Sequence, residues 1–137
     1  MADHHIMTGQ GKTYLRFRTE SLSVTKLDLF HDERFLYSAT GFLYNHGKDV
    51  ALVANWHVFA AVNPNSGHGR SDGLVPNRVE FHVSISNRED QSVFFQPASR
   101  PLVAADGASI WWEHERYLNL AGKWKIVDIG VLLLNDL

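Results

Sequence analysis

The sequence predicts an all-β fold, and three observations lead to this prediction. The first is a strict alternation in which Val79, Phe81, Val83 and Ile85 are separated by polar residues, which is the period of a half-exposed antiparallel strand. The second is a series of short runs of β-branched and aromatic residues, bounded by turn-forming residues. The third is the lack of a sustained helical periodicity. Together they favour an antiparallel barrel or sandwich.

The composition limits the classes of function. With 137 residues, of which 45% are hydrophobic, the chain can build the core of one domain. A formal net charge of -2 without a basic patch does not favour nucleic acid as a partner. The lack of cysteine excludes a disulfide framework, a cysteine nucleophile and a thiolate metal site. The N-terminus does not resemble a signal peptide, and no apolar run reaches the roughly 20 residues of a membrane-spanning helix. We therefore expect a soluble cytoplasmic protein without a membrane partner.

The chain divides into two parts. Residues 1–21, which begin with a polar, glycine-containing stretch, are expected to form a flexible N-terminal segment. Residues 22–137 are expected to form one β domain. Its first strand is predicted over residues 24–30, and after a polar turn at 31–34 an aromatic-rich strand follows over residues 35–44.

The centre of the predicted fold is a pair of strands that leads to a histidine. Residues 39–44 and 50–54 are predicted to be strands joined by a polar turn, and the second is continuously apolar, as in a strand buried on both faces. Asn55 is expected to cap a short helical turn that carries His57. Taken alone, such a histidine is more often structural than catalytic.

The remainder of the chain is expected to add further strands and loops. The alternation that begins at Val79 turns His82 toward solvent. We expect a loop over 63–73, a strand over 92–96 that ends at Pro97, a hairpin formed by 102–103 and 110–112 around an Asp106–Gly107 turn, a loop over 117–123 and a buried closing strand over 124–134.

Asp128 is the second unusual residue, because it lies inside an apolar strand pattern. Its neighbours Ile126, Val127, Ile129 and Val131 predict that neither face of the strand offers it solvent. A buried carboxylate needs hydrogen bonds or an opposite charge. The partner can be a histidine ring held in one tautomer, or it can be backbone amides, Arg or Lys. From the residues alone, both readings stay open.

Three segments, taken in order, resemble a known family. Residues 39–42 read Ala-Thr-Gly-Phe, residues 54–58 read Ala-Asn-Trp-His-Val and residues 127–132 read Val-Asp-Ile-Gly-Val-Leu. This order resembles the N-terminal half of a trypsin-like (chymotrypsin-fold) serine peptidase of the bacterial single-domain type. The resemblance implies an antiparallel Greek-key β-barrel, the N-terminal one of two, in which His57 is the general base and Asp128 orients it. It also implies a protein or peptide substrate and no cofactor.

The resemblance extends over residues 22–137 and includes small departures. Ala39, Ala54 and Gly130 each replace another small residue of the family pattern and leave the two catalytic positions unchanged. Residues 112–114, Trp-Glu-His, resemble the segment that precedes the aspartate strand in the bacterial members. No catalytic role is assigned to them.

The family's nucleophile has no counterpart in the sequence. In the family, a second barrel supplies the serine in a Gly-Asp-Ser-Gly-like turn, the oxyanion-hole amides and the specificity pocket, whereas this sequence ends nine residues after Asp128. Ser66 and Ser109 have neither the expected order nor the expected turn. We therefore expect the chain alone to be inactive and to need a C-terminal barrel from the same or a second chain.

The sequence leaves two alternatives to the peptidase interpretation. The sequence holds no His-Glu-x-x-His pattern, and the adjacent residues of Glu113-His114-Glu115 would point to opposite sides of a strand, so no metal site is expected. The second alternative is a non-catalytic pseudo-peptidase or half-barrel that acts as an interaction module. Its exposed apolar surface would include Trp111, Trp112 and residues 132–134, and it would self-associate or bind a partner.

Overall fold

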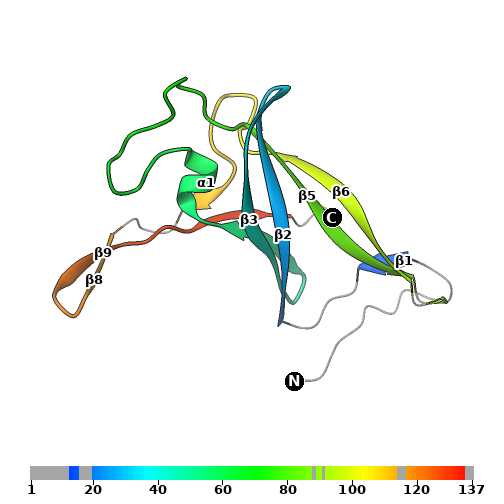
Figure 1. Ribbon diagram of the computed structural model, residues 1–137. Coiled ribbons are helices and arrows are strands. Elements are labelled where there is room, and N and C mark those ends of the chain that lie inside the picture. The colour runs from blue at the N-terminus through cyan, green and yellow to red at the C-terminus, as the bar shows by residue number, and fades with distance from the viewer. Residues whose placement is uncertain (1–12, 16–19, 88, 91, 114–116, 135–137) are drawn as a thin grey trace.

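The fold is built almost entirely from antiparallel strands, as the sequence predicts (Figure 1). The computed structural model describes residues 13–15, 20–87, 89–90, 92–113 and 117–134. The elements are β1 (Thr13–Leu15), β2 (Glu20–His31), β3 (Arg34–His46), β4 (Asp49–Ala54), α1 (Trp56–Ala60), β5 (Arg78–Asn87), β6 (Val93–Pro101), β7 (Trp112–Glu113), β8 (Tyr117–Leu120), β9 (Lys123–Ile126) and β10 (Gly130–Leu133).

One large sheet holds most of these strands. Its order is β1-β5-β2-β3-β4-β10-β7, with β6 paired to the other edge of β5, while β8 and β9 form a separate hairpin. The long β2 and β3 strands stand in the middle of Figure 1, with the β5–β6 hairpin on one side and the β8–β9 hairpin on the other. Over the described residues the sheet is open, because no pairing joins its two ends. The predicted closure into a Greek-key barrel therefore stays a prediction.

The core lies on one face of this sheet. The alternation in β5 is confirmed, since Val79, Phe81 and Val83 are at most 4% exposed whereas His82 points to solvent. The central strand β4 is buried as predicted along nearly its whole length. Further side chains that complete the core are Leu27, Leu29, Leu43, Leu52, Phe59, Leu102, Leu132 and Leu134.

Two expectations about strand boundaries are wrong. The strand expected to end at Pro97 continues to residue 101. Among the described strands β6 pairs only with β5, and a proline without an N–H group is tolerated on an edge strand. The loop expected over 117–123 contains β8 and the start of β9. Its turn residues, Ala121 and Gly122, have φ angles of 52° and 78°, the left-handed conformation that a two-residue hairpin turn requires.

The N-terminal boundary also differs from the expectation. Part of the segment expected to be flexible is strand, because residues 13–15 pair with residues 85–87 of β5 and β2 begins at Glu20. Residues 1–12 and 16–19 lie outside the described residues. The hairpin expected around Asp106 and Gly107 is present in short form, with a single bridge between Val103 and Ser109.

Candidate active site

The segment that carries His57 is a single helical turn, as the sequence predicts. Asn55 is extended, with φ -64° and ψ 145°, and its carbonyl accepts a bond of 3.0 Å from the amide of Val58. The turn ends at Ala61, which has a φ of 55° and donates its amide to the carbonyl of His57 over 2.9 Å. The expected side-chain cap at Asn55 is wrong. The side-chain amide of Asn55 instead donates from Nδ2 to the backbone carbonyl of Asp128 over 3.2 Å.

The structure brings His57 and Asp128 together, although 71 positions separate them. Strand β10 pairs with β4 so that Gly130 lies opposite Ala54. The residues just before β10 therefore meet those just after β4. One carboxylate oxygen of Asp128 accepts the backbone amide of His57 over 2.9 Å. The other lies 2.5 Å from Nδ1 of the His57 ring.

Asp128 is less buried than its neighbours in the sequence predict. The side chain of Asp128 is 23% exposed to solvent, and the side chain of His57 is 47% exposed. The predicted closing strand is divided into β9 and β10, so that Asp128 lies in the connection between them. Ile126 and Ile129 are accordingly about two-fifths exposed, at 40% and 43%. Both kinds of partner that the sequence left open are present, because the carboxylate binds a histidine ring and a backbone amide.

This contact assigns a tautomer to neutral His57. An ionised carboxylate can only accept hydrogen bonds, so Nδ1 must carry the proton that it shares with Asp128. The free lone pair of the ring is then on Nε2, and the ring orientation is fixed by its partner. The pair can therefore present a basic nitrogen that takes a proton from a nearby hydroxyl group.

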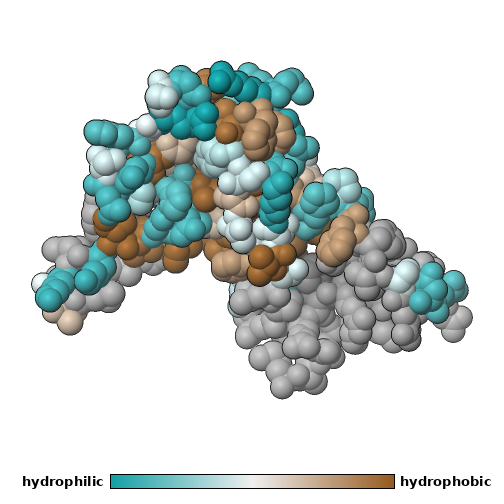
Figure 2. Space-filling model, in the orientation of Figure 1, coloured by the Kyte–Doolittle hydropathy of each residue, from teal (hydrophilic) through white to brown (hydrophobic). Residues whose placement is uncertain are grey.

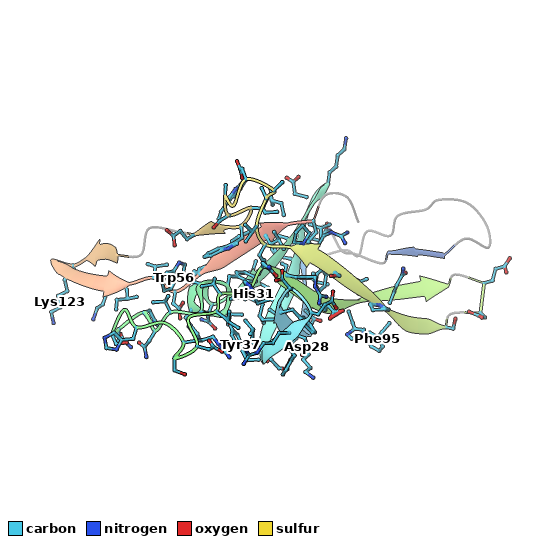
Figure 3. All side chains as sticks on the ribbon, turned by 90° about the horizontal axis from the view of Figure 1, so that it is seen from above. Asp28, His31, Tyr37, Trp56, Phe95 and Lys123 are labelled. Carbon is cyan, nitrogen blue, oxygen red and sulfur yellow. The ribbon has the colours of Figure 1, made fainter. Side chains whose placement is uncertain are left out.

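Side chains from two other strands hold the helical turn. The indole N–H of Trp56 donates to the Glu113 carboxylate on β7, and the Tyr37 hydroxyl on β3 donates to the carbonyl of Val58. Figure 3 shows Trp56 beside the α1 ribbon and Tyr37 on the neighbouring part of the sheet. Phe59 is 1% exposed, and its ring centroid lies 5.4 Å from that of Trp111.

An ion pair fixes the loop that follows this turn. Arg70 donates from Nε and Nη2 to the two carboxylate oxygens of Asp72, over 3.0 and 2.8 Å. The hydrogen bonds from Arg70 are the main reason that the pKa of Asp72 lies far below its usual range. The hydrogen bond that Asp72 accepts from the backbone amide of Leu74 lowers the pKa further. The Arg70 guanidinium also lies 5.7 Å from the ring centroid of Tyr37. Burial raises the pKa of Tyr37 to about 12, an effect that the charge of Arg70 partly opposes.

The other sequence candidates do not join this site. Ser66 accepts the amide of His68 within the 63–73 loop, and among the described residues no hydrogen bond links Ser66 or Ser109 to His57. No group of three or more His, Asp or Glu residues in the described parts of the chain is arranged to hold a metal ion. Residues 114 and 115 of the Glu113-His114-Glu115 segment lie outside the described residues.

Sequence reasoning missed the roles of Trp56, Glu113 and Tyr37. The only signal for Glu113 is its place in the Trp-Glu-His segment, and the sequence does not show which residue the carboxylate meets. The same limit applies to Tyr37, since it contacts a backbone carbonyl 21 positions away.

Comparisons of the chain with protein-family models, curated proteins and solved structures find no match. Within the described residues, the helix is too short to cross a membrane.

Proposed function

We propose that His57 and Asp128 are the general base and the orienting carboxylate of a trypsin-like serine endopeptidase that acts on proteins or peptides. The observation that supports the proposal most directly is the double contact in which Asp128 binds both the backbone amide and the ring of His57. The nucleophilic serine would lie outside this sequence, in a C-terminal barrel. No cofactor is required, and a cytoplasmic location stays a prediction from the N-terminal sequence.

In this mechanism the two residues act as one unit. Nε2 of His57 takes the proton of the serine hydroxyl as that oxygen attacks the peptide carbonyl, and later gives the proton to the leaving amine. Asp128 keeps Nδ1 protonated and stabilises the imidazolium that forms. The half-exposed His57 ring can be reached by a nucleophile from another segment, since it is not enclosed by its own sheet.

The test uses the protein isolated from its natural source and compares its intact mass with the 15.5 kDa of this chain. We expect a larger protein, or a tightly bound second chain, that reacts covalently with a fluorophosphonate serine probe. In that protein, Asp128→Asn should lower peptide hydrolysis by about 10⁴-fold while the fold is retained. Near-normal turnover in Asp128→Asn contradicts the proposal, as does peptidase activity of the 137-residue chain alone.

A second candidate function, an interaction module, is favoured by an apolar stripe on the outer face of the sheet. Val24, Phe42, Val53, Val131 and Trp112 lie directly opposite one another across five neighbouring strands. Directly opposed residues in antiparallel strands share a face. Val24 and Trp112, at the ends of the stripe, are 77% and 62% exposed. Figure 2 also shows apolar surface below the polar loops of the molecule.

The stripe differs from the surface expected from sequence. Leu132 and Leu134 face the core at 4% and 0% exposure, and Trp111 packs against it. An outward face is normally polar in an antiparallel sheet, so an apolar one indicates a covered surface. If a second copy covers it, the average mass by light scattering should rise with concentration. Trp112→Ser should reduce that rise, whereas Phe35→Ser, which removes a ring that is 53% exposed at the start of β3 and is not part of the stripe, should not. A strictly monomeric chain at high concentration would count against this function.

A further inference from the structure

The helical turn that carries His57 depends on contacts made elsewhere in the fold. With five residues, α1 is far shorter than helices that are stable in isolation. It lacks a side-chain cap at Asn55 and an acidic residue in its first turn. The orientation of His57 must therefore be set by what α1 touches.

The contact between Trp56 and Glu113 is well placed to set it. Trp56 immediately precedes His57 and is 6% exposed, so its indole N–H requires an acceptor inside the protein. Glu113 supplies a carboxylate for this bond. Strand β7 places Glu113 directly opposite Gly130, two positions after Asp128. Carboxylates from neighbouring segments thus hold two consecutive residues of α1, Trp56 by Glu113 and His57 by Asp128.

We propose that Glu113 and Trp56 are a positioning pair that aligns the His57 ring with Asp128. The proposal rests on the general-base role suggested above for His57, and it assigns no contact with substrate to either residue. The bond to a charged acceptor is stronger and more directional than a neutral one. This bond fixes Trp56, the first residue of α1. The ring of His57, the next residue, therefore meets the Asp128 carboxylate in one orientation.

A purely stabilising role would give a different result. If Glu113 only satisfied a buried indole, its loss would lower the free energy of unfolding but leave His57 on Asp128 in the folded molecules. A positioning role predicts that the proton on the ring is redistributed in molecules that are still folded. The populations of the two neutral tautomers of His57 therefore separate these roles.

The experiment is long-range ¹H–¹⁵N NMR on the 137-residue chain labelled with [¹⁵N]histidine, at alkaline pH where imidazoles are neutral. The resonances of His57 are assigned with His57→Gln. We expect the Nδ1–H form to dominate in the unmodified chain and in Glu113→Gln, whose side-chain oxygen still accepts from Trp56. In Glu113→Ala and in Trp56→Phe, the ratio of the Nδ1–H to the Nε2–H form should fall by about tenfold, as one strong hydrogen bond is lost. Trp56→Phe keeps most of the buried ring and so tests the same bond if Glu113→Ala does not fold.

Glu80→Ala is the matched control, because Glu80 is a carboxylate of β5 that pairs with Arg78 and not with α1. An unchanged tautomer ratio in folded Glu113→Ala and Trp56→Phe would overturn the positioning role. So would an equal change in Glu80→Ala. Asp128→Asn separates the two proposals. If Asp128→Asn changes the ratio and the Glu113 variants do not, only the positioning role fails. If Asp128→Asn also leaves the ratio unchanged, the assigned His57–Asp128 contact is wrong and both proposals fail.

Discussion

Gly130 tests whether close packing beneath α1 sets the position of the helical turn. A Cβ atom at this position would lie 2.6 Å from Cδ2 of Phe59 and 3.3 Å from Cε3 of Trp111. Carbon atoms in contact are normally separated by about 3.5–4.0 Å, so the first distance is short by roughly 1 Å. Phe59 is 1% exposed and cannot move aside into solvent. Gly130→Ala should therefore displace Phe59, and α1 with it.

The expected cost follows from two opposing effects. Forcing an extra methyl group into a packed core typically costs about 1–3 kcal/mol. Replacing a strand glycine by alanine gains about 0.5–1 kcal/mol, because the unfolded chain loses freedom. The free energy of unfolding should therefore fall by about 1–2 kcal/mol. For a domain of this size that corresponds to a decrease in Tm of roughly 4–8 °C.

The assay is urea unfolding followed by tryptophan fluorescence, with Gly69→Ala as the control. The Cβ of an alanine at position 69 would have its nearest neighbour at 3.7 Å, an ordinary contact, so this variant should be close to neutral. Phe59→Leu should partly rescue Gly130→Ala, giving a coupling energy of about 1 kcal/mol between the two positions. Equal midpoints for Gly130→Ala and Gly69→Ala, or strictly additive effects of Gly130→Ala and Phe59→Leu, would refute the packing argument.

Three further predictions concern the surroundings of the site. Because burial raises the pKa of Tyr37 to about 12, its contribution to stability should be complete below about pH 10 and be lost as the pH rises through about 12. The loss should be about 1–2 kcal/mol, less than full linkage would give because the ring is only half-buried, and Tyr37→Phe should remove this pH dependence in urea titrations. The low pKa of Asp72 predicts the opposite direction. Its ion pair with Arg70 should weaken as the pH falls below about 4, seen as lower amide protection factors in the 63–73 loop, and in Asp72→Asn these protection factors should be low at all pH values. Gly41→Ala would bring its Cβ to 2.9 Å from the backbone carbonyl of Val53, so its melting temperature should fall well below that of Gly69→Ala.

The strands that the sequence predicts well are those whose pattern shows directly which face is buried. In β5 the alternation of apolar and polar residues from Val79 onward matches the pleat of the strand and shows which side chains face the core. In β4 the continuous apolar run reports burial on both faces. The strands that were missed have no such pattern. β1 is three residues long and is defined by its pairing with β5, and the β8–β9 turn uses Ala121-Gly122 where Asn-Gly is the usual signal.

The candidate site was predictable only in part, for a related reason. A carboxylate among apolar residues needs a partner, and this requirement, together with the family resemblance, pointed from Asp128 to His57. The sequence predicts that Asp128 is buried, because the apolar run from 124 to 134 reads as one continuous strand. The structure instead ends β9 at Ile126 and begins β10 at Gly130, so Asp128 lies between two strands and is partly exposed. Glu113 and Tyr37 could not be connected to α1, since those contacts depend on which strands become neighbours.

The register of β10 with its two neighbouring strands brings Asp128, His57 and Glu113 into one site. Gly130 lies opposite Ala54 on one side and opposite Glu113 on the other, so a single residue of β10 aligns three segments. A slip of one residue would turn the side chains of β10 to the opposite face and separate Asp128 from His57. Gly130 is also the residue against which Phe59 packs. Gly130 therefore fixes both the register of β10 and the position of α1. Substitutions at Gly130 or Glu113 should change the orientation of the His57 ring although neither residue contacts it.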